Sequence, residues 1–427
     1  ALFTSGSFYR SVVATVLRGA AGMSISLTAA MGAAFLFNKS EWTYELFRPL
    51  LAILRSIPVI SFILLALIFL NAESIPLIIA FLTMFPLLTE NLTRGLRSRR
   101  KELSIMAHQF KIGRWNRLAQ VIYPQLKPFL YSGLASALGF GWRAIIMGEV
   151  LAQCTPGIGG EMKQAQVFIN VPELIAWTII AILISYLFDK GISRLGKQQF
   201  PIHYNKHASE LPAAEGNCDI RIQDLSYRYG PETVISHLSY TFGQGFIYGI
   251  TAPSGTGKTT LLNLIGNILQ PAQGVIKMNC KPGIPYVFQE PCLLNQLTIA
   301  ENIALPLAGW LTKEMALEQA ISVLREMELA DFANRFPNEL SFGQQQRVAI
   351  ARALAYPSPL LLMDEPFKGM DEALSRRIIE CIREQQAESR QTILFTSHNP
   401  EELRLFADKP VRLEQNKGQT IIFATQI

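Results

Sequence analysis

Charged residues are scarce in this chain. Asp, Glu, Lys and Arg make up 17% of its 427 residues, whereas soluble proteins usually carry about 25%. Hydrophobic residues make up 49%, and the mean hydropathy is positive, at +0.23. This composition excludes a disordered or low-complexity chain and argues against a wholly soluble protein.

Cysteine is also rare, with only five residues. They form no CxxC pair and are odd in number, so we expect neither a disulfide framework nor a cysteine zinc site.

The charges that are present are unevenly distributed. Residues 1–206 contain 20 Lys and Arg against 9 Asp and Glu, whereas residues 207–427 contain 19 against 24. The basic half is also the apolar half. That combination is typical of a membrane domain with basic cytoplasmic loops, and it argues against a nucleic-acid binder.

Long apolar runs fill the first 200 residues. Each is close to the roughly 20 residues that a helix needs to cross a bilayer. The five runs are Val12–Phe37, Leu50–Leu70, Ser74–Leu92, Pro128–Leu151 and Val171–Ile192. They predict a bundle of five transmembrane helices.

Basic residues in the loops predict the orientation of these helices. Arg94–Lys127 contains nine Lys and Arg and one acid, so it should be cytoplasmic. Ala152–Asn170 has Lys163 as its single basic residue and should face outward. Everything after the last run is then cytoplasmic. Residue 1 falls outside, and a further span upstream would restore a cytoplasmic N-terminus.

Residues 198–217 are polar, contain Pro201, Pro212 and Gly216, and show no apolar period. They predict a linker between a membrane domain, residues 1–197, and a second domain, residues 218–427.

The second domain contains a sequence motif typical of phosphate-binding loops. Residues 252–260 read Ala-Pro-Ser-Gly-Thr-Gly-Lys-Thr-Thr, which is G-x-x-x-x-G-K-[ST] with Ala252 at the first glycine. Strand-like Phe246–Thr251 precedes it and helical Leu261–Leu269 follows. We expect Lys258 to reach the β and γ phosphates and Thr259 to bind Mg²⁺. The predicted nucleotide-binding residues here are Ser254, Gly255, Thr256, Gly257, Lys258, Thr259 and Thr260.

A second motif begins with the apolar run Leu360–Met363, which ends in Asp364 and Glu365. Such a run is typical of a buried parallel strand, and acids at its end lie at the ligand-binding edge of the sheet. We expect Asp364 to hold Mg²⁺, directly or through water, and Glu365 to polarise the attacking water.

Three further motifs lie before and after this strand in the sequence. Gln289 follows strand-like Ile284–Phe288, Leu340–Gln344 reads LSFGQ, and His398 follows strand-like Thr392–Thr396. With these motifs, residues 218–415 resemble the ATP-binding cassette family, whose signature LSGGQ has Phe342 in place of a glycine here. The resemblance implies an α/β P-loop domain with a helical subdomain between about Pro291 and Tyr356.

The resemblance also implies roles for single residues. Glu365, His398 and Lys258 would be catalytic, and two copies of the chain would sandwich two ATP molecules. The remaining ATP-binding residues would be Tyr229, Gln289, Ser341, Gly343, Gln344 and Asp371, and the Mg²⁺ ligands Thr259, Gln289 and Asp364.

The membrane half, about residues 8–197, resembles the permeases of binding-protein-dependent importers for nitrate, taurine and alkanesulfonates. Ile105–Trp115, followed by Val121–Pro124, is similar to their cytoplasmic EAA loop. Ile105 stands where Glu is usual, and Lys111 where Gly is usual. The resemblance implies that a short helix from this loop docks into the cassette beside Gln289.

Two ionisable residues, Arg143 and Glu149, fall within the fourth apolar run. They indicate either a substrate pathway, with Arg143 attracting an anion, or a structural pairing with other helices and the outer interface.

We therefore expect an α-helical transmembrane permease bundle fused to a cassette that uses ATP and Mg²⁺. It would lie in the cytoplasmic membrane of a prokaryote as a multi-pass protein, with the cassette on the cytoplasmic side. Its partners would be a second copy of the chain and an extracytoplasmic substrate-binding protein, with no nucleic acid. The solute would be an organic sulfonate, a nitrate-like anion or a related small molecule. A half-size exporter is the alternative; a soluble cassette regulator is disfavoured by the apolar runs.

Overall fold

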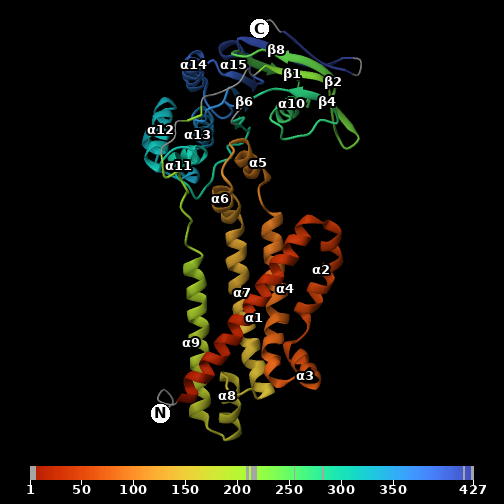
Figure 1. Cartoon of the computed structure of the whole chain (residues 1–427), viewed down its shortest axis with the longest axis vertical. Helices are drawn as coiled ribbons and strands as arrows, with labels where there is room; N and C mark the ends of the chain where they lie inside the picture. Colours follow the sequence, from red (N-terminus) through yellow and green to blue (C-terminus); the bar gives the residue numbers. More distant parts are fainter. Residues whose placement is uncertain are drawn as a thin grey trace. The chain divides into compact units, whose positions relative to one another are not determined.

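The computed structural model describes residues 6–207, 211–212, 219–253, 255–280, 283–416 and 419–424. The chain divides into two compact units, each shown in Figure 1. The first unit contains Ala1–Arg99 and Ile122–Phe200, and the second contains Arg100–Val121 and Pro201–Ile427. Residues 100–121, which the sequence placed in the permease domain, therefore group with the second unit. Ser254 and part of the expected linker lie outside the described residues.

The first unit is helical. Its helices are α1 (Gly6–Lys39), α2 (Glu41–Ser56), α3 (Val59–Phe69), α4 (Ile75–Arg97), α7 (Tyr123–Ala152), α8 (Ile158–Val167) and α9 (Val171–Leu195), with a 3₁₀ turn, η2, at Ala72–Ser74. Helix α4 packs against both α1 and α7. Small residues allow this close packing: a Cβ added at Gly22 would lie 2.6 Å from the Cβ of Ala80.

Among the described residues, four helices are long and apolar enough to cross a membrane, or five if one bent pair counts as a span. The bent pair corresponds to Leu50–Leu70, which the sequence predicted as one continuous helix. Instead α2 and α3 meet at 92°. Pro58 lies at the break and cannot donate a helical hydrogen bond, and it disfavours a helical conformation at Ile57.

The second unit contains two sheets. The strands are β1 (Ile220–Tyr229), β2 (Glu232–Phe242), β3 (Ile247–Thr251), β4 (Gln273–Lys277), β5 (Tyr286–Val287), β6 (Leu360–Asp364), β7 (Thr392–Thr396), β8 (Lys409–Asn416) and β9 (Gln419–Ala424). Antiparallel β2, β1 and β4 form the smaller sheet. The larger has the order β5-β6-β7-β3-β8-β9, parallel except for β9.

The second unit also contains helices. They are α5 (Lys101–Gln109), α6 (Arg114–Asn116), a π-helical turn η3 (Arg117–Ile122), α10 (Lys258–Ile265), α11 (Ile299–Ala304), α12 (Lys313–Glu326), α13 (Phe342–Leu354), α14 (Glu372–Ser389) and α15 (Pro400–Phe406). Short 3₁₀ turns lie at Leu305–Leu307, Ala330–Phe332 and Pro337–Glu339. Helices α11 to α13 occupy the region expected to be the helical subdomain.

The parallel register fixes the position of the site. Asp364 pairs with Thr396, which pairs with Ile250, so β6, β7 and β3 end at the same edge. All residues of β6 and β7 are buried. The continuous apolar run of β6 is therefore a fully covered strand, as the sequence predicted.

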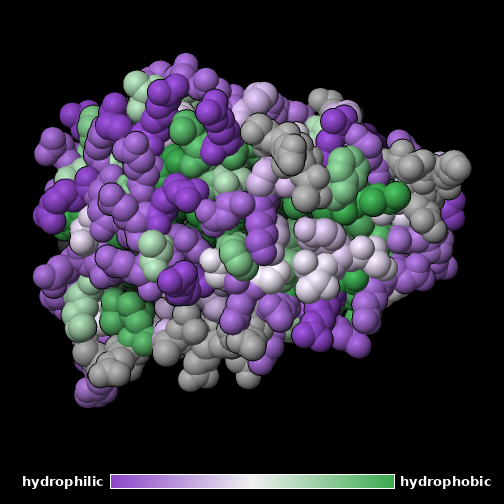
Figure 2. Space-filling view, turned by 90° about the horizontal axis from the view of Figure 1, so that it is seen from above, coloured by the Kyte–Doolittle hydropathy of each residue, from purple (hydrophilic) through white to green (hydrophobic). Residues whose placement is uncertain are grey.

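The surfaces of the two units differ in chemistry. The face seen in Figure 2 is mostly hydrophilic, with smaller hydrophobic areas. In the first unit, the most apolar stretch of α9 is only 6% buried, and its exposed side chains include Ile175, Ile179 and Ile182. Such a helix is suited to lipid or to another copy of the chain.

One expectation about cysteine is wrong. Cys280 is disulfide-bonded, although Cys154, Cys292 and Cys381 are free. The sequence offered no spacing that marks this residue.

Candidate nucleotide-binding and coupling site

The loop before α10 has the backbone of a phosphate-binding loop. Gly255 and Gly257 have φ of +82° and +98°, in the left-handed region that favours glycine. A Cβ at Gly257 would also lie 2.8 Å from Cγ1 of Val234. Gly257 caps α10, whose first backbone N–H groups are therefore available to an anion.

Lys258 is held over this loop. Its side chain is buried, and its Nζ donates to the carbonyl oxygen of Ala252 at 2.8 Å. Burial lowers the pKa of Lys258, while the charges of Glu365 and Asp364 oppose this effect. The loop lysine and the two acids predicted from β6 thus lie within electrostatic reach of one another.

Asp364 lies at the buried end of β6. Its Oδ1 accepts a hydrogen bond of 2.6 Å from Oγ1 of Thr396. Oγ1 of Thr396 in turn accepts from the backbone N–H of Glu365 at 3.0 Å. Burial raises the pKa of Asp364, whereas hydrogen bonds from Thr396 and Thr259 lower it. The predicted metal ligands Thr259 and Asp364 are therefore in contact.

Glu365 brings together residues that follow three neighbouring strands. Its Oε2 accepts from Nε2 of Gln289 at 3.2 Å, and its Oε1 lies 3.1 Å from Nε2 of His398. Gln289 follows β5, Glu365 follows β6, and His398 follows β7. The arrangement can position a carboxylate as a proton acceptor between two polar neighbours.

Glu402 was missed by the sequence reasoning. Ser397 donates a short hydrogen bond to its carboxylate, and the backbone N–H of Asn399 donates to Oγ of Ser397 at 3.0 Å. Burial raises the pKa of Glu402, and hydrogen bonds from Ser397 and Asn399 oppose the shift. These contacts fix the turn that carries His398. Carboxylates are common in the first turn of helices, so the position of Glu402 in the first turn of α15 did not identify it as a site residue.

The predicted signature residues begin α13. The backbone N–H of Gln344 donates to Oγ of Ser341 at 3.3 Å, and the N–H of Ser341 donates to Oε1 of Gln344 at 2.9 Å. This capping box leaves Ser341 exposed at the helix start. Asp371 caps α14 by accepting from the N–H of Leu374 at 2.9 Å.

Phe342 replaces a glycine of the signature and lies against Gly369. A Cβ at Gly369 would come 2.8 Å from Cδ1 of Phe342, and a Cβ at Gly343 would come 2.5 Å from the carbonyl oxygen of Gly369. The two glycines therefore allow the start of α13 to pack closely on the segment before α14.

Tyr229, the predicted adenine-stacking residue, ends β1. Its ring lies edge-on to that of Tyr227, with centroids 4.9 Å apart, and about half of its surface is exposed. Within the described part of the chain, no hydrogen bond or ion pair joins Tyr229, Ser341, Gln344 or Asp371 to Lys258 or Glu365.

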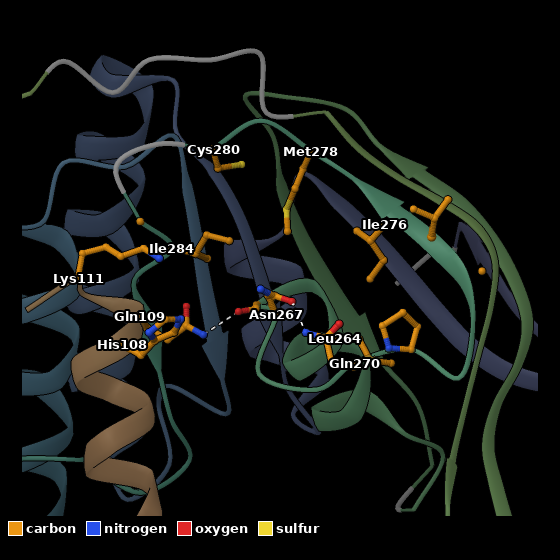
Figure 3. Close-up of a pocket in the computed structure, with 15 residues that line it drawn as sticks. His108, Gln109, Lys111, Leu264, Asn267, Gln270, Ile276, Met278, Cys280 and Ile284 are labelled. Atoms are coloured by element: carbon orange, nitrogen blue, oxygen red, sulfur yellow. Dashed lines mark hydrogen bonds between the residues drawn. The ribbon is translucent and has the colours of Figure 1, made fainter.

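The segment from Arg100 to Val121, here called the coupling segment, docks on the cassette within the second unit. Ala107 and Phe110 are fully buried and join a hydrophobic core that includes Leu294. Nε2 of Gln109 donates to the carbonyl oxygen of Gly266 at 2.6 Å, beside the cavity seen in Figure 3. The predicted docking is confirmed.

In space, the docked segment lies beside Glu290, the residue that follows Gln289. A guanidinium nitrogen of Arg100 lies 3.7 Å from a carboxylate oxygen of Glu290, which follows Gln289 directly. The contact places one end of α5 beside the residue that reaches Glu365.

A buried arginine connects the coupling segment to the signature helix. Arg352, on α13, is 1% exposed and donates to the carbonyl oxygen of Cys292 at 2.7 Å. Its guanidinium carbon lies 5.1 Å from the centre of the Phe110 ring. Burial lowers the pKa of Arg352 to about 10. Helix α13 thus carries Ser341 at one end and contacts the coupling segment near the other.

The backbone conformation at Lys111 shows why the family pattern has glycine at this position. Its φ is +49°, a left-handed conformation that glycine adopts without strain. Glycine is therefore the expected residue at this turn after α5, and lysine carries a conformational cost. The side chain runs along the cavity in Figure 3, which His108, Asn267 and Gln270 also line.

The first unit does not bring Arg143 and Glu149 together. Glu149 is fully buried and pairs with Arg18 at 2.7 Å, and Oγ1 of Thr15 donates to it at 2.9 Å. The backbone N–H of Gly159 donates to the same carboxylate at 3.0 Å. These contacts tie α1, α7 and α8, which favours the structural interpretation of Glu149. Arg143 is exposed on α7.

Comparison with known proteins agrees with this geometry. Residues 23–192 match the family model of binding-protein-dependent transport system inner membrane components, and residues 235–368 match that of ABC transporters. The thiamine import ATP-binding protein ThiQ of Vibrio cholerae is 32% identical over 204 residues, which are 45% of this chain and 86% of that protein. The chain belongs to the ABC transporter family. In it, permease and cassette regions occupy one polypeptide.

Other relatives of this ABC transporter are matched over part of their length. A Salmonella paratyphi A protein named for 2-aminoethylphosphonate import, PhnT, is 34% identical over 213 residues, 47% of this chain and 58% of that protein. The sulfate/thiosulfate import ATP-binding protein CysA 2 of Shewanella oneidensis is 33% identical over 214 residues, 47% of this chain and 60% of that protein. The chain therefore spans a little over half the length of these two relatives.

Proposed function

We propose that this ABC transporter hydrolyses ATP to import a small solute across the cytoplasmic membrane of a prokaryote, with the cassette on the cytoplasmic side. The observation that carries the proposal is the docking of the coupling segment. Its sequence belongs to the permease-like region, yet it packs into the cassette beside Glu290 and next to Gln289, whose side chain contacts Glu365. One polypeptide thus joins a permease loop to the proposed catalytic carboxylate.

The proposed hydrolysis assigns each group at the sheet edge a task. The backbone of the loop and Lys258 hold the phosphates, and Glu365 accepts a proton from the attacking water. His398 and Gln289 orient the two oxygens of Glu365. The other loop residues, Gly255, Thr256, Gly257 and Thr260, shape the phosphate site, and Tyr229 stacks on the adenine.

The residues present fit a magnesium ion. Thr259, Asp364 and Gln289 offer hydroxyl, carboxylate and amide oxygens, which are the ligands that Mg²⁺ prefers when phosphates complete its coordination. When bound, the ion neutralises charge on the phosphates.

The working unit in this proposal contains two copies of the chain. Ser341 is exposed, and neither it nor Gln344 makes a hydrogen bond to Lys258 or Glu365 in the described part of its own chain. A second cassette would bring Ser341, Gly343 and Gln344 to the nucleotide held by the first. Asp371, which caps α14 close to Gly369, would lie at the same junction.

The proposed solute is a small organic sulfonate, a nitrate-like anion or a related compound, delivered by an extracytoplasmic substrate-binding protein near Ala152–Asn170. The support is the match to binding-protein-dependent permeases and the names of the relatives, which include phosphonate, thiamine and sulfate import. Arg143 would contribute positive charge to the path. A half-size exporter is the second candidate, on the ground that it too joins membrane helices and cassette in one chain.

Stimulation of hydrolysis tests the proposal. In proteoliposomes with ATP on the cassette side, the solute-loaded binding protein on the opposite side should raise the rate of phosphate release, since binding outside and cassette closure are linked equilibria. ATP-driven efflux in the absence of any binding protein would instead favour the exporter.

A further inference from the structure

A cavity of about 640 Å³ lies within the second unit, and none of the residues that line it is proposed to bind ATP. Three segments line it: the coupling segment, residues 203–207, and the turn after α11. We call residues 203–207 the strap. The cavity is lined by Lys111, Gly113, Arg114, Trp115, Asn116, His203, Tyr204, Asn205, Lys206, His207, Leu305, Pro306, Ala308, Gly309 and Trp310.

Two asparagines hold the strap in place. Nδ2 of Asn116 donates to the carbonyl oxygen of His203, and the N–H of His203 donates to Oδ1 of Asn116, both at 2.8 Å. On the other side, the N–H of Asn205 donates to the carbonyl oxygen of Ala308 at 2.9 Å. The strap therefore connects the coupling segment to the helical subdomain, and the cavity lies at their junction.

The lining combines basic and aromatic side chains. Lys111, Arg114 and Lys206 are cationic, and His203 and His207 add two imidazoles; none of the described residues that line the cavity is acidic. Glu301 is close enough to influence Tyr204, but its carboxylate accepts from the N–H of Thr298 at 2.9 Å in the cap of α11. The net charge of the lining is positive, which suits an anion.

The aromatic residues that line the cavity favour a ligand with a planar group. Trp115, Tyr204 and Trp310 line the same space, and such rings stack on planar groups. The hydroxyl of Tyr204 is buried with no hydrogen-bond partner among the described residues. Burial raises the pKa of Tyr204, so the phenol stays protonated and can donate.

We propose that this cavity binds a small organic anion that carries a planar ring. Arg114 and Lys206 contact the anionic group, and the aromatic residues contact the ring. Because the walls come from three segments, the occupant holds the coupling segment, the strap and the helical subdomain together. Occupancy therefore slows hydrolysis that depends on movement of the coupling segment.

Calorimetric titration of the purified full chain tests binding with three probes. Phenylphosphonate carries both groups, methylphosphonate lacks the ring, and phenol lacks the charge. Phenylphosphonate should bind at least about tenfold more tightly than either, which corresponds to about 1.4 kcal/mol. The double variant Arg114→Gln/Lys206→Ala should lose this binding, and Trp115→Leu should abolish the preference for phenylphosphonate over methylphosphonate. Lys313→Ala, an exposed lysine on α12, is the matched control.

Several results would overturn the inference. They are no binding of phenylphosphonate up to about 10 mM, affinities of the three probes within about twofold of one another, or binding that survives Arg114→Gln/Lys206→Ala. Circular dichroism and ATP affinity identify a variant that has failed to fold, and Lys206→Ala alone, at an exposed strap position, then replaces the double variant. Phenylphosphonate should also lower the ATPase rate of the parent and leave that of Lys206→Ala unchanged; equal inhibition of both would contradict the regulatory role.

Discussion

Glu365 and His398 are in direct contact, with Oε1 of Glu365 3.1 Å from Nε2 of His398. The other carboxylate oxygen accepts from Gln289. Because β6 lies between β5 and β7 in the sheet, the two partners approach Glu365 from neighbouring strands on either side. Gln289 precedes Glu290, which pairs with Arg100 of the coupling segment. We therefore propose that a displacement of that segment is transmitted to the carboxylate.

The first prediction concerns hydrolysis. Glu365→Gln should retain ATP binding but reduce steady-state phosphate release by at least about a hundredfold, because the amide cannot accept the proton from water. Lys258→Ala should weaken ATP binding itself. Glu380→Gln, at an exposed site on α14, is the matched control. A Glu365→Gln rate above about a tenth of the parent rate would exclude Glu365 as the base, since that loss is only about 1.4 kcal/mol of barrier.

The second prediction follows from the buried charge of Asp364. Its pKa is raised in the folded chain, so the native state binds more protons than the unfolded state over the interval between the two pKa values. Stability should therefore fall as pH rises through that interval. Asp364→Asn should melt at a higher temperature than the parent, by more at about pH 8 than at about pH 5.

Two further results accompany Asp364→Asn. The variant should lose the Mg²⁺ dependence of ATP binding, whereas Asp331→Asn, at an exposed site, should leave both properties unchanged. A melting temperature for Asp364→Asn below that of the parent at both pH values would contradict the assignment of an unfavourable buried charge.

The third prediction concerns coupling. Ala107 has no exposed surface, so Ala107→Glu should displace α5 from the cassette and abolish transport while ATP binding is retained. His108→Glu, which places the same charge at the neighbouring exposed position, should transport normally. Uptake by Ala107→Glu at the parent rate would contradict a role of α5 in coupling ATP hydrolysis to transport. Arg100→Cys/Glu290→Cys should be joined by a bifunctional thiol reagent that spans the length of the two native side chains, which meet at their ends.

The fourth prediction concerns the turn after α5. Lys111→Gly should preserve docking and raise the free energy of unfolding by up to about 1 kcal/mol, because it relieves the strain of the left-handed backbone. The greater conformational freedom of glycine in the unfolded chain partly offsets this gain. Glu102→Gly, within helical α5, should instead cost about 1 kcal/mol. Thermal melts of the two variants check this; a lower melting temperature for Lys111→Gly would show that the lysine side chain stabilises the turn.

The candidate site was largely predictable from the sequence because its residues follow buried strands. The apolar runs before Gln289, Asp364 and His398 are strands of one parallel sheet, so their ends meet at one edge. Even so, the contact of both Gln289 and His398 with Glu365 depends on strand order, which no local pattern contains.

Other features depend on tertiary structure alone. The bend between α2 and α3 was missed because apolar composition continues through Pro58. Glu149 lies within an apolar run, but its partner Arg18 is 131 residues away. Arg352 resembles any helical arginine in the sequence, and only packing places it between Cys292 and Phe110.

Solute accumulation in proteoliposomes tests the central claim most directly. With the binding protein and a labelled sulfonate on the side opposite the cassettes and ATP on the cassette side, label should accumulate on the cassette side against its gradient. It should fail to do so with Glu365→Gln. Accumulation that proceeds equally well with Glu365→Gln, or ATP-dependent movement of label away from the cassette side, would contradict the account.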